Sequence, residues 1–259
     1  MTSLPPTRAS LAADLAGLGL STGDIVLVHS SMRAIGWVPG GPVAVVQALL
    51  DVLGQEGTLV VPAQTGANSD PEHWSRPPVP VAWWQTIRDH MPAFDPAITP
   101  SRGIGAVAES VRTWPGAARS DHPQTSFAAL GARAAELMAR HDLTSQLGEG
   151  SPLGALEEAG ARVLLLGVGF DVCTAFHLAE YRVPSPRTEY GAAVLAPGGR
   201  EWITYTDVAV DSEDFGVLGA AYEPTATLAR GRVGGADARL FPLPEAVSFA
   251  TTWLRDNRR

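Results

Sequence analysis

The chain of 259 residues contains little cysteine, no long apolar run and few basic residues. Its single cysteine, Cys173, cannot form a disulfide within the chain, which is typical of proteins from reducing compartments. No apolar run approaches the roughly 20 residues that a membrane-spanning helix needs. The first nine residues lack the basic and apolar regions of a secretory signal. We therefore expect a cytoplasmic protein that does not enter a membrane.

Basic residues are outnumbered: 19 Lys and Arg stand against 27 Asp and Glu, for a net charge of −8 with His neutral. Because nucleic-acid binding needs a basic surface, we expect no nucleic-acid partner. An acidic cleft would suit a cationic substrate, although an acidic surface also simply keeps a protein soluble. The charge excludes one class of partner without selecting another.

Two nucleotide-binding motifs are absent, namely GxGxxG after a strand and GxxxxGK[ST], which argues against Rossmann dinucleotide and P-loop sites. Zinc is not expected, because His177 and Glu180 do not form HExxH and a third ligand at zinc spacing is missing. The chemistry that these absences leave open is acid–base catalysis by side chains. An alternative is nucleophilic catalysis by the thiol of Cys173, beside His177.

Hydrophobic periodicity predicts alternating helices and strands. Residues 24–28 and 58–61 are predicted strands, and a helix between them, through 43–53, is expected to end at Gly54. This order predicts a parallel pair with a crossover connection. The strongest strand signal is 162–168.

The other segments are less regular. Residues 63–102, rich in Pro and Trp, predict a packed insertion with a short helix near 83–90. After residue 187 the pattern predicts a β-hairpin over 190–195 and 202–208. Further helices are expected through Leu11, Leu15 and Leu18 with Ser10 as candidate N-cap, and at 105–114, 132–141, 174–181, 214–222 and 244–255.

Two glycine- or serine-rich segments are candidate anion sites. His29, Ser30 and Ser31 end the first strand, where backbone N–H groups and hydroxyls can hold phosphate. The alternative is an ordinary polar turn that caps a helix. Ser101 and Arg102 precede a predicted helix together with two glycines, so the segment suits either a close ligand approach or plain helix capping.

A third segment contains His122 and Pro123 with Ser126 and Phe127. This polar and aromatic set would suit the wall of a cofactor channel. A turn that leads into a strand explains it equally simply, and the residues alone favour the turn.

The sharpest candidate site follows the strand at 162–168. If a helix begins near Thr174, His177 and Glu180 are three residues apart and share a face. A neighbouring carboxylate orients an imidazole and raises its basicity, which suits deprotonation of an amine. Asp171 and Thr174 lie beside the pair in sequence. The alternative is a surface histidine with one polar contact.

Acidic residues gather in two other segments. Asp70 and Glu72 lie in the long insertion, and Asp211, Glu213, Asp214 and Glu223 lie near the helix at 214–222. Carboxylates that converge on a cleft would bind a polyamine, whereas any single one of them is adequately explained as solvated surface charge.

Several uncommon short motifs, which occur in the same order along nearly the whole chain, resemble those of the aminoglycoside 3-N-acetyltransferase family. They are Leu27-Val28-His29-Ser30-Ser31, Trp83-Trp84, Met91-Pro92-Ala93-Phe94-Asp95-Pro96, Thr99-Pro100-Ser101-Arg102-Gly103, Trp114-Pro115-Gly116, His122-Pro123, Ser126-Phe127-Ala128-Ala129, Ser151-Pro152-Leu153-Gly154 and Thr174-x-x-His177-x-x-Glu180-Tyr181.

The resemblance implies a fold distinct from that of the GNAT acetyltransferases, with acetyl-CoA as donor and the 3-amino group of a 2-deoxystreptamine ring as acceptor. It implies His177 as the base and Glu180 as its partner or as an anchor for the amine. We expect backbone N–H groups or Thr174 to stabilise the oxyanion. The implied coenzyme residues are Ser30, Ser31, Arg33, Ile35, Gly36, Ser101, Arg102, Ile104, Ser126 and Phe127. The implied aminoglycoside-binding residues are Asp70, Glu72, Asp171, Glu213, Asp214 and Glu223.

Pattern and resemblance together predict an α/β protein: a central mixed sheet flanked by helices in three layers, with a C-terminal β-hairpin subdomain. We expect one domain over 1–259, with a change of organisation near 187, no metal, and an oligomeric state that leaves a homodimer open.

The chain departs from the family pattern at Phe170, where His is expected, and at Cys173, where Asn is common. We expect both in the mouth of the site. They keep open an acyltransferase of the same fold that acts on a different amine. A binder of cationic drugs without turnover is the alternative from another class.

Overall fold

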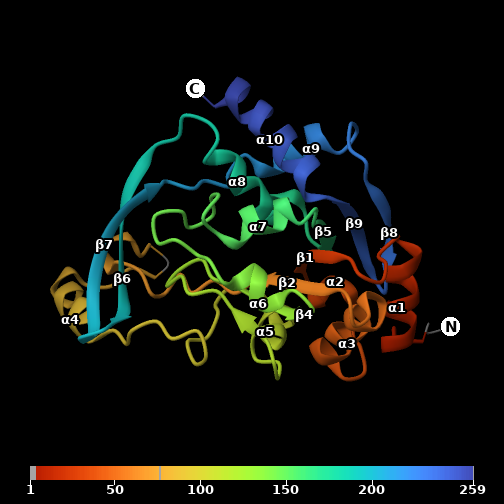
Figure 1. Ribbon diagram of the computed structural model, residues 1–259, viewed down its shortest axis with the longest axis horizontal. Helices are drawn as coiled ribbons and strands as arrows, with labels where there is room; N and C mark the ends of the chain where they lie inside the picture. Colours follow the sequence, from red (N-terminus) through yellow and green to blue (C-terminus); the bar gives the residue numbers. More distant parts are fainter. Residues whose placement is uncertain (1–3, 76, 259) are drawn as a thin grey trace.

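The computed structural model describes residues 4–75 and 77–258. The expectation that the first nine residues are not a secretory signal concerns a segment whose first three residues lie outside the described part. A seven-stranded sheet forms the centre of the molecule, in the order β3-β4-β2-β1-β5-β9-β8 (Figure 1). Within the described residues, no helix is both long and apolar enough to span a bilayer.

The middle of the sheet is parallel and its flanks are antiparallel. β1 (Ile25–Ser30) pairs in parallel with β2 (Thr58–Pro62) and with β5 (Arg162–Leu166). Helix α3 (Gly41–Leu53) crosses from β1 to β2, so the predicted crossover is confirmed. The antiparallel strands are β4 (Phe127–Gly131) and β3 (Ala118–Arg119) on one side, and β9 (Ala236–Pro242) and β8 (Ala229–Val233) on the other.

The central strands are apolar on both faces, because each face is covered by helices. On β1, Ile25 and Leu27 belong to one core and Val26 and Val28 to the other. Helices α1 (Arg8–Gly17), α2 (Met32–Ile35), α3 and α5 (Ala106–Arg112) pack on one face. Helices α6 (Ala134–Met138), α7 (Pro152–Glu158), α8 (His177–Glu180), α9 (Phe215–Tyr222) and α10 (Leu243–Asn257) pack on the other. The predicted three-layer α/β arrangement is confirmed.

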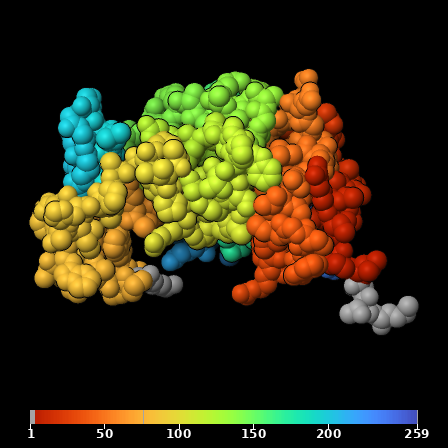
Figure 2. All heavy atoms as spheres, turned by 90° about the horizontal axis from the view of Figure 1, so that it is seen from below, coloured from red at the N-terminus to blue at the C-terminus, as the bar shows by residue number. Residues whose placement is uncertain are grey.

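The predicted hairpin is also confirmed, as β6 (Arg187–Ala196) and β7 (Gly199–Val208). It forms a separate two-stranded sheet that packs on the 63–102 segment, which contains α4 (Trp84–His90) (Figure 1). The Asn68 side chain holds the two together: its Nδ2 atom donates to the Ala193 carbonyl, and its Oδ1 atom accepts from Ala193 N, both at 3.0 Å. Figure 2 shows this segment and the hairpin gathered at one end of the molecule, with α1 and α3 at the other.

The hairpin is not the last β structure, because the chain afterwards returns to the central sheet. β8 and β9 pair with each other, and β9 pairs with β5. These two strands were not predicted. The interior of β8 is Arg-Gly-Arg and exposed, so it lacks the alternation that marks a half-buried strand.

Three helix predictions need correction. Ser10 is not the N-cap of α1: the helix begins at Arg8, and the hydroxyl of Thr7 accepts a bond from Ser10 N at 3.2 Å. The helix predicted at 132–141 is limited to α6. The helix predicted at 174–181 is a 3₁₀ turn, Thr174–Phe176, followed by the single turn of α8. Such short elements are held by packing rather than by helix propensity.

Candidate active site

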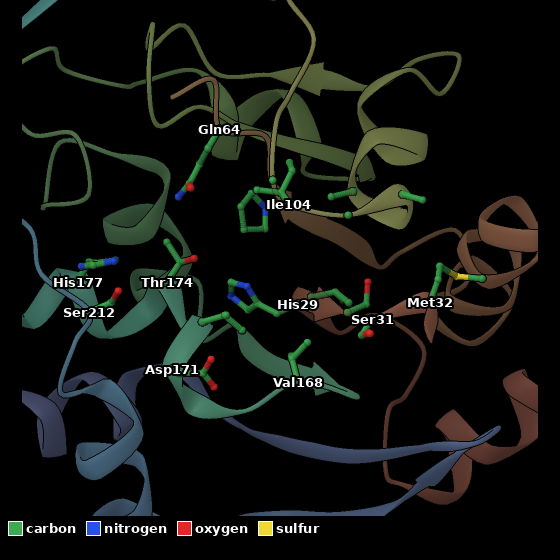
Figure 3. A pocket seen from close by; sticks show the side chains of 18 residues that line it. His29, Ser31, Met32, Gln64, Ile104, Val168, Asp171, Thr174, His177 and Ser212 are labelled. Carbon is green, nitrogen blue, oxygen red and sulfur yellow. The ribbon is translucent and has the colours of Figure 1, made fainter. Parts of the chain in front are cut away.

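A cavity of about 480 Å³ opens at the carboxyl ends of β1, β2 and β5. Ligands commonly bind at this edge of an α/β sheet. Figure 3 shows His177 and Thr174 at one end of the cavity, Ser31 and Met32 at the other, and His29 between them. Further lining comes from Gln64 after β2, Ile104 before α5, and Val168, Asp171 and Ser212.

His177 and Glu180 form a hydrogen-bonded pair at this cavity. The Nδ1 atom of His177 is 2.6 Å from Oε2 of Glu180, and the side chains are 14% and 1% exposed. The three-residue spacing within α8 puts both on one face, as predicted. Since Nδ1 is engaged by the carboxylate, Nε2 is the nitrogen left for a substrate.

The buried carboxylate of Glu180 has two more partners. Its Oε1 atom accepts a bond from the backbone N–H of Asp211 at 3.0 Å and another from Arg258. A buried charge is stable only when it is paired and hydrogen-bonded. The ring of Phe215 covers His177, with centroids 4.7 Å apart. The imidazole is therefore fixed both by its acid partner and by packing.

The structure brings Thr174 and Asp171 to the same cavity. Thr174 is 6% exposed and begins the 3₁₀ turn before α8. Asp171 is exposed, in the turn after β5. Their positions agree with the expected oxyanion donor and substrate anchor, and these roles stay predictions.

Three of the predicted coenzyme residues line the cavity: Ser30, Ser31 and Ile104. Ser31 is also the N-cap of α2, where its hydroxyl accepts a weak bond from Ala34 N at 3.4 Å. Ser31 therefore both caps a helix and lines the cavity, and its role in binding a ligand stays a prediction.

The other predicted coenzyme residues lie outside the cavity wall. Ile35, Ser126 and Phe127 are completely buried, and Ser126 donates to the Ala63 carbonyl at 2.8 Å. Ser101 donates to the carboxylate of Glu109. Arg33 and Arg102 are exposed, and Gly36 has a φ of 95° at the end of α2. Because the side chains of Arg33 and Arg102 are exposed, they could contact the part of a coenzyme that extends out of the cavity, and this role stays a prediction.

His29 belongs to the cavity although the prediction chose only its neighbours. The side chain is 8% exposed, and its buried Nε2 atom has no hydrogen-bond partner among the described residues. Burial, with a smaller contribution from nearby His177, lowers its pKa to about 4, so the ring is neutral at pH 7. Its place at a strand end had already put it in a candidate anion site, but it was left out of the expected coenzyme residues. Gln64, two residues after β2, was missed, although its place after a strand end was the signal that could have identified it.

Phe170 and Cys173 do not lie in the mouth of the site, and that expectation is wrong. Phe170 is 6% exposed and stacks on Phe176, with centroids 6.0 Å apart, in an aromatic cluster under α9. Cys173 is fully buried, and burial raises its thiol pKa to about 12. An aromatic ring and a thiol, which packs as a small apolar group, both gain free energy in the core. Neither touches the cavity, and the thiol is not a nucleophile at neutral pH.

Asp70 and Glu72 line a second cavity, of about 360 Å³, between the insertion and the hairpin. Asp70 accepts two bonds from Arg88, at 2.9 and 2.7 Å. Burial alone would raise the pKa of Asp70, but the bonds from Arg88 keep it below its usual range. These two acids are therefore not gathered with His177 in the cavity at the strand ends.

The acids near α9 also have separate surroundings. Glu213 is exposed, in the segment that contributes Ser212 to the cavity. Asp214 is paired with Arg258, with Oδ1 and Nη2 2.5 Å apart. Glu223 is paired with Arg239 and Arg230. Roles in substrate binding stay predictions. The carboxylates of Asp214 and Glu223 are already paired with arginines, so a substrate ammonium group would have to share them.

His122 forms part of a buried polar turn rather than a channel wall. Its Nδ1 atom accepts from Gln124 N at 3.2 Å, and its ring lies 4.6 Å from that of His141. Of the two interpretations of this segment, a channel wall or a turn that leads into a strand, the structure has the turn, which leads into β4. The described residues contain no cluster of three or more His, Cys, Asp or Glu that could hold a metal ion.

Comparison with known proteins gives one consistent result. The family described as aminoglycoside 3-N-acetyltransferase matches residues 27–255. The chain is 46% identical to the "SPbeta prophage-derived aminoglycoside N(3')-acetyltransferase-like protein YokD" of Bacillus subtilis, over 99% of this chain and 95% of the relative. It is 40% identical to aminoglycoside N(3)-acetyltransferase IX of Micromonospora chalcea, over 96% and 94%.

Solved structures agree. The crystal structure of Bacillus subtilis YokD superimposes with a TM-score of 0.97 at 46% identity, covering 99% of this chain and 96% of that one. The structure titled "AAC-IIIb binary with CoASH" has a TM-score of 0.86 at 32% identity, with 97% of each chain covered. "AAC-VIa bound to Sisomicin" has a TM-score of 0.88 at 31% identity, with 98% of each covered. This protein, with its His177–Glu180 pair at the strand-end cavity, belongs to the aminoglycoside 3-N-acetyltransferase family.

Proposed function

We propose that this protein transfers an acetyl group from acetyl-CoA to the 3-amino group of the 2-deoxystreptamine ring of an aminoglycoside, and so confers resistance to the antibiotic. The observation that carries the proposal is the His177–Glu180 pair, in which Glu180 engages Nδ1 and leaves the other ring nitrogen, Nε2, for a ligand of the cavity at the strand ends. Membership of an acyltransferase family supports the reaction class.

The reaction proposed is direct transfer within a ternary complex. Nε2 of His177 removes a proton from the substrate amine, and the imidazolium formed is stabilised by the Glu180 carboxylate. The amine nitrogen attacks the acetyl carbonyl carbon, a C–N bond forms, and the C–S bond to coenzyme A breaks. The thiolate leaves and is protonated. The hydroxyl of Thr174, at the same cavity, is the proposed donor to the oxyanion.

The shape of the cavity supports acetyl-CoA as donor. Ser31 lies at the end of the cavity away from His177 (Figure 3). Ser30 and the segment 103–106 also line the cavity, which offers hydroxyls, backbone N–H groups and close approach at two glycines. This end would hold the polar part of the coenzyme, and the thioester would then lie toward Thr174. A relative solved with CoASH has the same fold.

Charge supports a polycationic acceptor. Asp171 lies at the cavity, and Asp211 and Glu213 flank Ser212, which also lines it. A net charge of −8 adds a favourable long-range field. One structural relative, AAC-VIa, was solved with sisomicin bound. We propose that Asp171 and Glu213 bind ammonium groups of the acceptor and hold one amine against the thioester by proximity.

A second candidate is acylation of a different amine by the same pair. It is kept because the 46% identical relative is named aminoglycoside N(3')-acetyltransferase-like, not aminoglycoside N(3)-acetyltransferase. The position of Phe170 and Cys173 in the core, away from the cavity, removes one reason for doubting an aminoglycoside acceptor.

The test is release of free thiol from acetyl-CoA in the presence of gentamicin, kanamycin, neomycin or apramycin, with mass spectrometry of the products. We expect thiol release that requires the drug, and a mass increase of one acetyl group on at least one of them. Binding of a drug without thiol release would show a sequestering protein instead. Binding of acetyl-CoA without turnover of any drug would favour another amine.

A further inference from the structure

We infer that Arg258, at the end of α10, is a positioning residue for the base: it holds Glu180 against His177 and sets the pH range over which the pair works. This inference rests on the proposed role of His177. Arg258 lies beyond residues 27–255, which match the family.

Arg258 connects three parts of the site. Its Nη1 atom donates to Oε1 of Glu180, the oxygen not used by His177. Its Nε atom donates to Oδ2 of Asp214 at 2.7 Å, and its Nη2 atom donates to Oδ1 of Asp214 and to the Asp211 carbonyl, both at 2.5 Å. The guanidinium thus ties the base's partner to the segment that borders the cavity.

Packing adds a fourth contact. The guanidinium carbon of Arg258 is 5.7 Å from the ring centroid of Phe215, the same ring that covers His177. The Arg258 side chain is 26% exposed, whereas Glu180 is 1% exposed. Arg258 is therefore the cation that compensates the charge of a carboxylate shielded from water.

The charge has a consequence for titration. One carboxylate, Glu180, is shared by a permanent cation and by an imidazole that becomes a cation on protonation. Removing the positive charge of Arg258 would make proton uptake by the pair easier, because a like charge near the imidazolium is lost. The pH midpoint of the His177–Glu180 pair, treated as one coupled unit, would rise.

Other ionisable groups also face the pair, and of these only Asp214 loses a side-chain partner when Arg258 is replaced. They are His29 on β1, Asp171 after β5, Tyr190 on β6, and Asp211 and Asp214 before α9. Asp214 loses its partner when Arg258 is replaced, and its freed negative charge acts in the same direction, toward a higher midpoint.

The experiment compares Arg258→Gln, which removes the charge and keeps a donor, with Arg258→Lys, which keeps the charge. Arg258→Met is a second neutral variant whose stem still covers Phe215. Arg255→Ala is the matched control, because Arg255 is exposed one turn earlier on the same helix. The imidazole protons of His177, assigned with a His177→Gln variant, are titrated by NMR in the free protein.

We expect the midpoint to rise by on the order of one pH unit in both neutral variants, to stay near wild type in Arg258→Lys, and to be unchanged in Arg255→Ala. The acid limb of kcat/KM should move in parallel, with about a tenfold loss of kcat and little change in KM for acetyl-CoA. A lower melting temperature with an unmoved midpoint in the variants that fold would overturn the inference, since it would show a purely structural anchor.

Because the NMR titration needs no substrate, it separates this inference from the proposed function. A shifted midpoint in a protein that acetylates no drug would keep the role of Arg258 and remove the aminoglycoside. An unmoved midpoint in an enzyme that acetylates a drug would keep the proposed function and remove the role of Arg258.

Discussion

The Nδ1 atom of His177 lies 2.6 Å from the Oε2 atom of Glu180, whose side chain is 1% exposed. This contact fixes which ring nitrogen faces the substrate, because the other is committed to a buried carboxylate. The pair, its cover by Phe215 and its cation Arg258 hold the imidazole in one orientation, as the proposed role of His177 as a base requires.

Replacement of His177 by alanine should lower kcat by ~10²–10⁴-fold, because the general base is lost. The Kd of acetyl-CoA should change little, since the coenzyme is expected to bind mainly at the opposite end of the cavity. Steady-state kinetics and calorimetric titration measure the two effects. His90→Ala, at an exposed histidine on α4, is the control and should behave as wild type. A His177→Ala enzyme with near wild-type kcat would remove His177 from this role.

Replacement of Cys173 by alanine should leave kcat within about twofold of wild type, because the thiol is buried and its pKa is raised to about 12. The free energy of unfolding should fall by about 1 kcal/mol, as expected for a small cavity in the core. Alkylation by iodoacetamide should be slow in the native protein and fast in urea. Loss of turnover without loss of folding in this variant would restore the thiol mechanism.

Two glycines on α9 should respond in opposite directions to alanine. A β-carbon at Gly219 would lie 2.1 Å from that of Phe170, so Gly219→Ala should destabilise the protein by about 1–3 kcal/mol through overpacking. At Gly216 the space is open, and alanine should stabilise the same helix by about 0.5–1 kcal/mol. Urea unfolding of both variants measures the difference. Equal effects would show that the turn of Phe170 is not packed on α9 as described.

Stability should depend on pH between about 6.5 and 4. Burial lowers the pKa of His29 and His122 to about 4 and that of His141 to about 3. Above pH 6.5 these rings are neutral in both folded and unfolded chains, so they have no effect. As the pH falls, the unfolded chain binds protons that the folded chain does not, and stability decreases.

From pH 7 to pH 5 the loss should be roughly 2 kcal/mol for each of the three rings. Urea midpoints measured at half-unit intervals of pH give the slope. A free energy of unfolding that is flat across this interval would show that these imidazoles are protonated, or exposed, in the folded protein.

The sequence was informative where its signal was local. The apolar runs of β1 and β5, the glycine at the end of α3, and the strand pattern of the hairpin led to correct elements. The spacing of His177 and Glu180 likewise placed the pair, since three residues along a helical turn determine a shared face. These predictions needed no knowledge of distant parts of the chain.

The sequence was misleading where tertiary packing decided. Arg239 interrupts the apolar pattern of β9, and the arginines of β8, the edge strand beside it, remove the alternation there, so neither strand was recognised. Phe170 and Cys173 follow a strand end, yet the turn directs both into the core. Arg258 shows the same limit: no local pattern indicates that a residue at the end of the chain contacts Glu180, 78 positions away.

The central claim is tested most directly by locating the acetyl group on the product. An aminoglycoside incubated with the enzyme and acetyl-CoA, purified and analysed by two-dimensional NMR, should carry one N-acetyl group, on the amine at position 3 of 2-deoxystreptamine. Acetylation at another amine would keep the acyltransferase chemistry and contradict the proposed orientation of the substrate. An unmodified drug, with the wild-type enzyme folded and bound to acetyl-CoA, would contradict the proposed function itself.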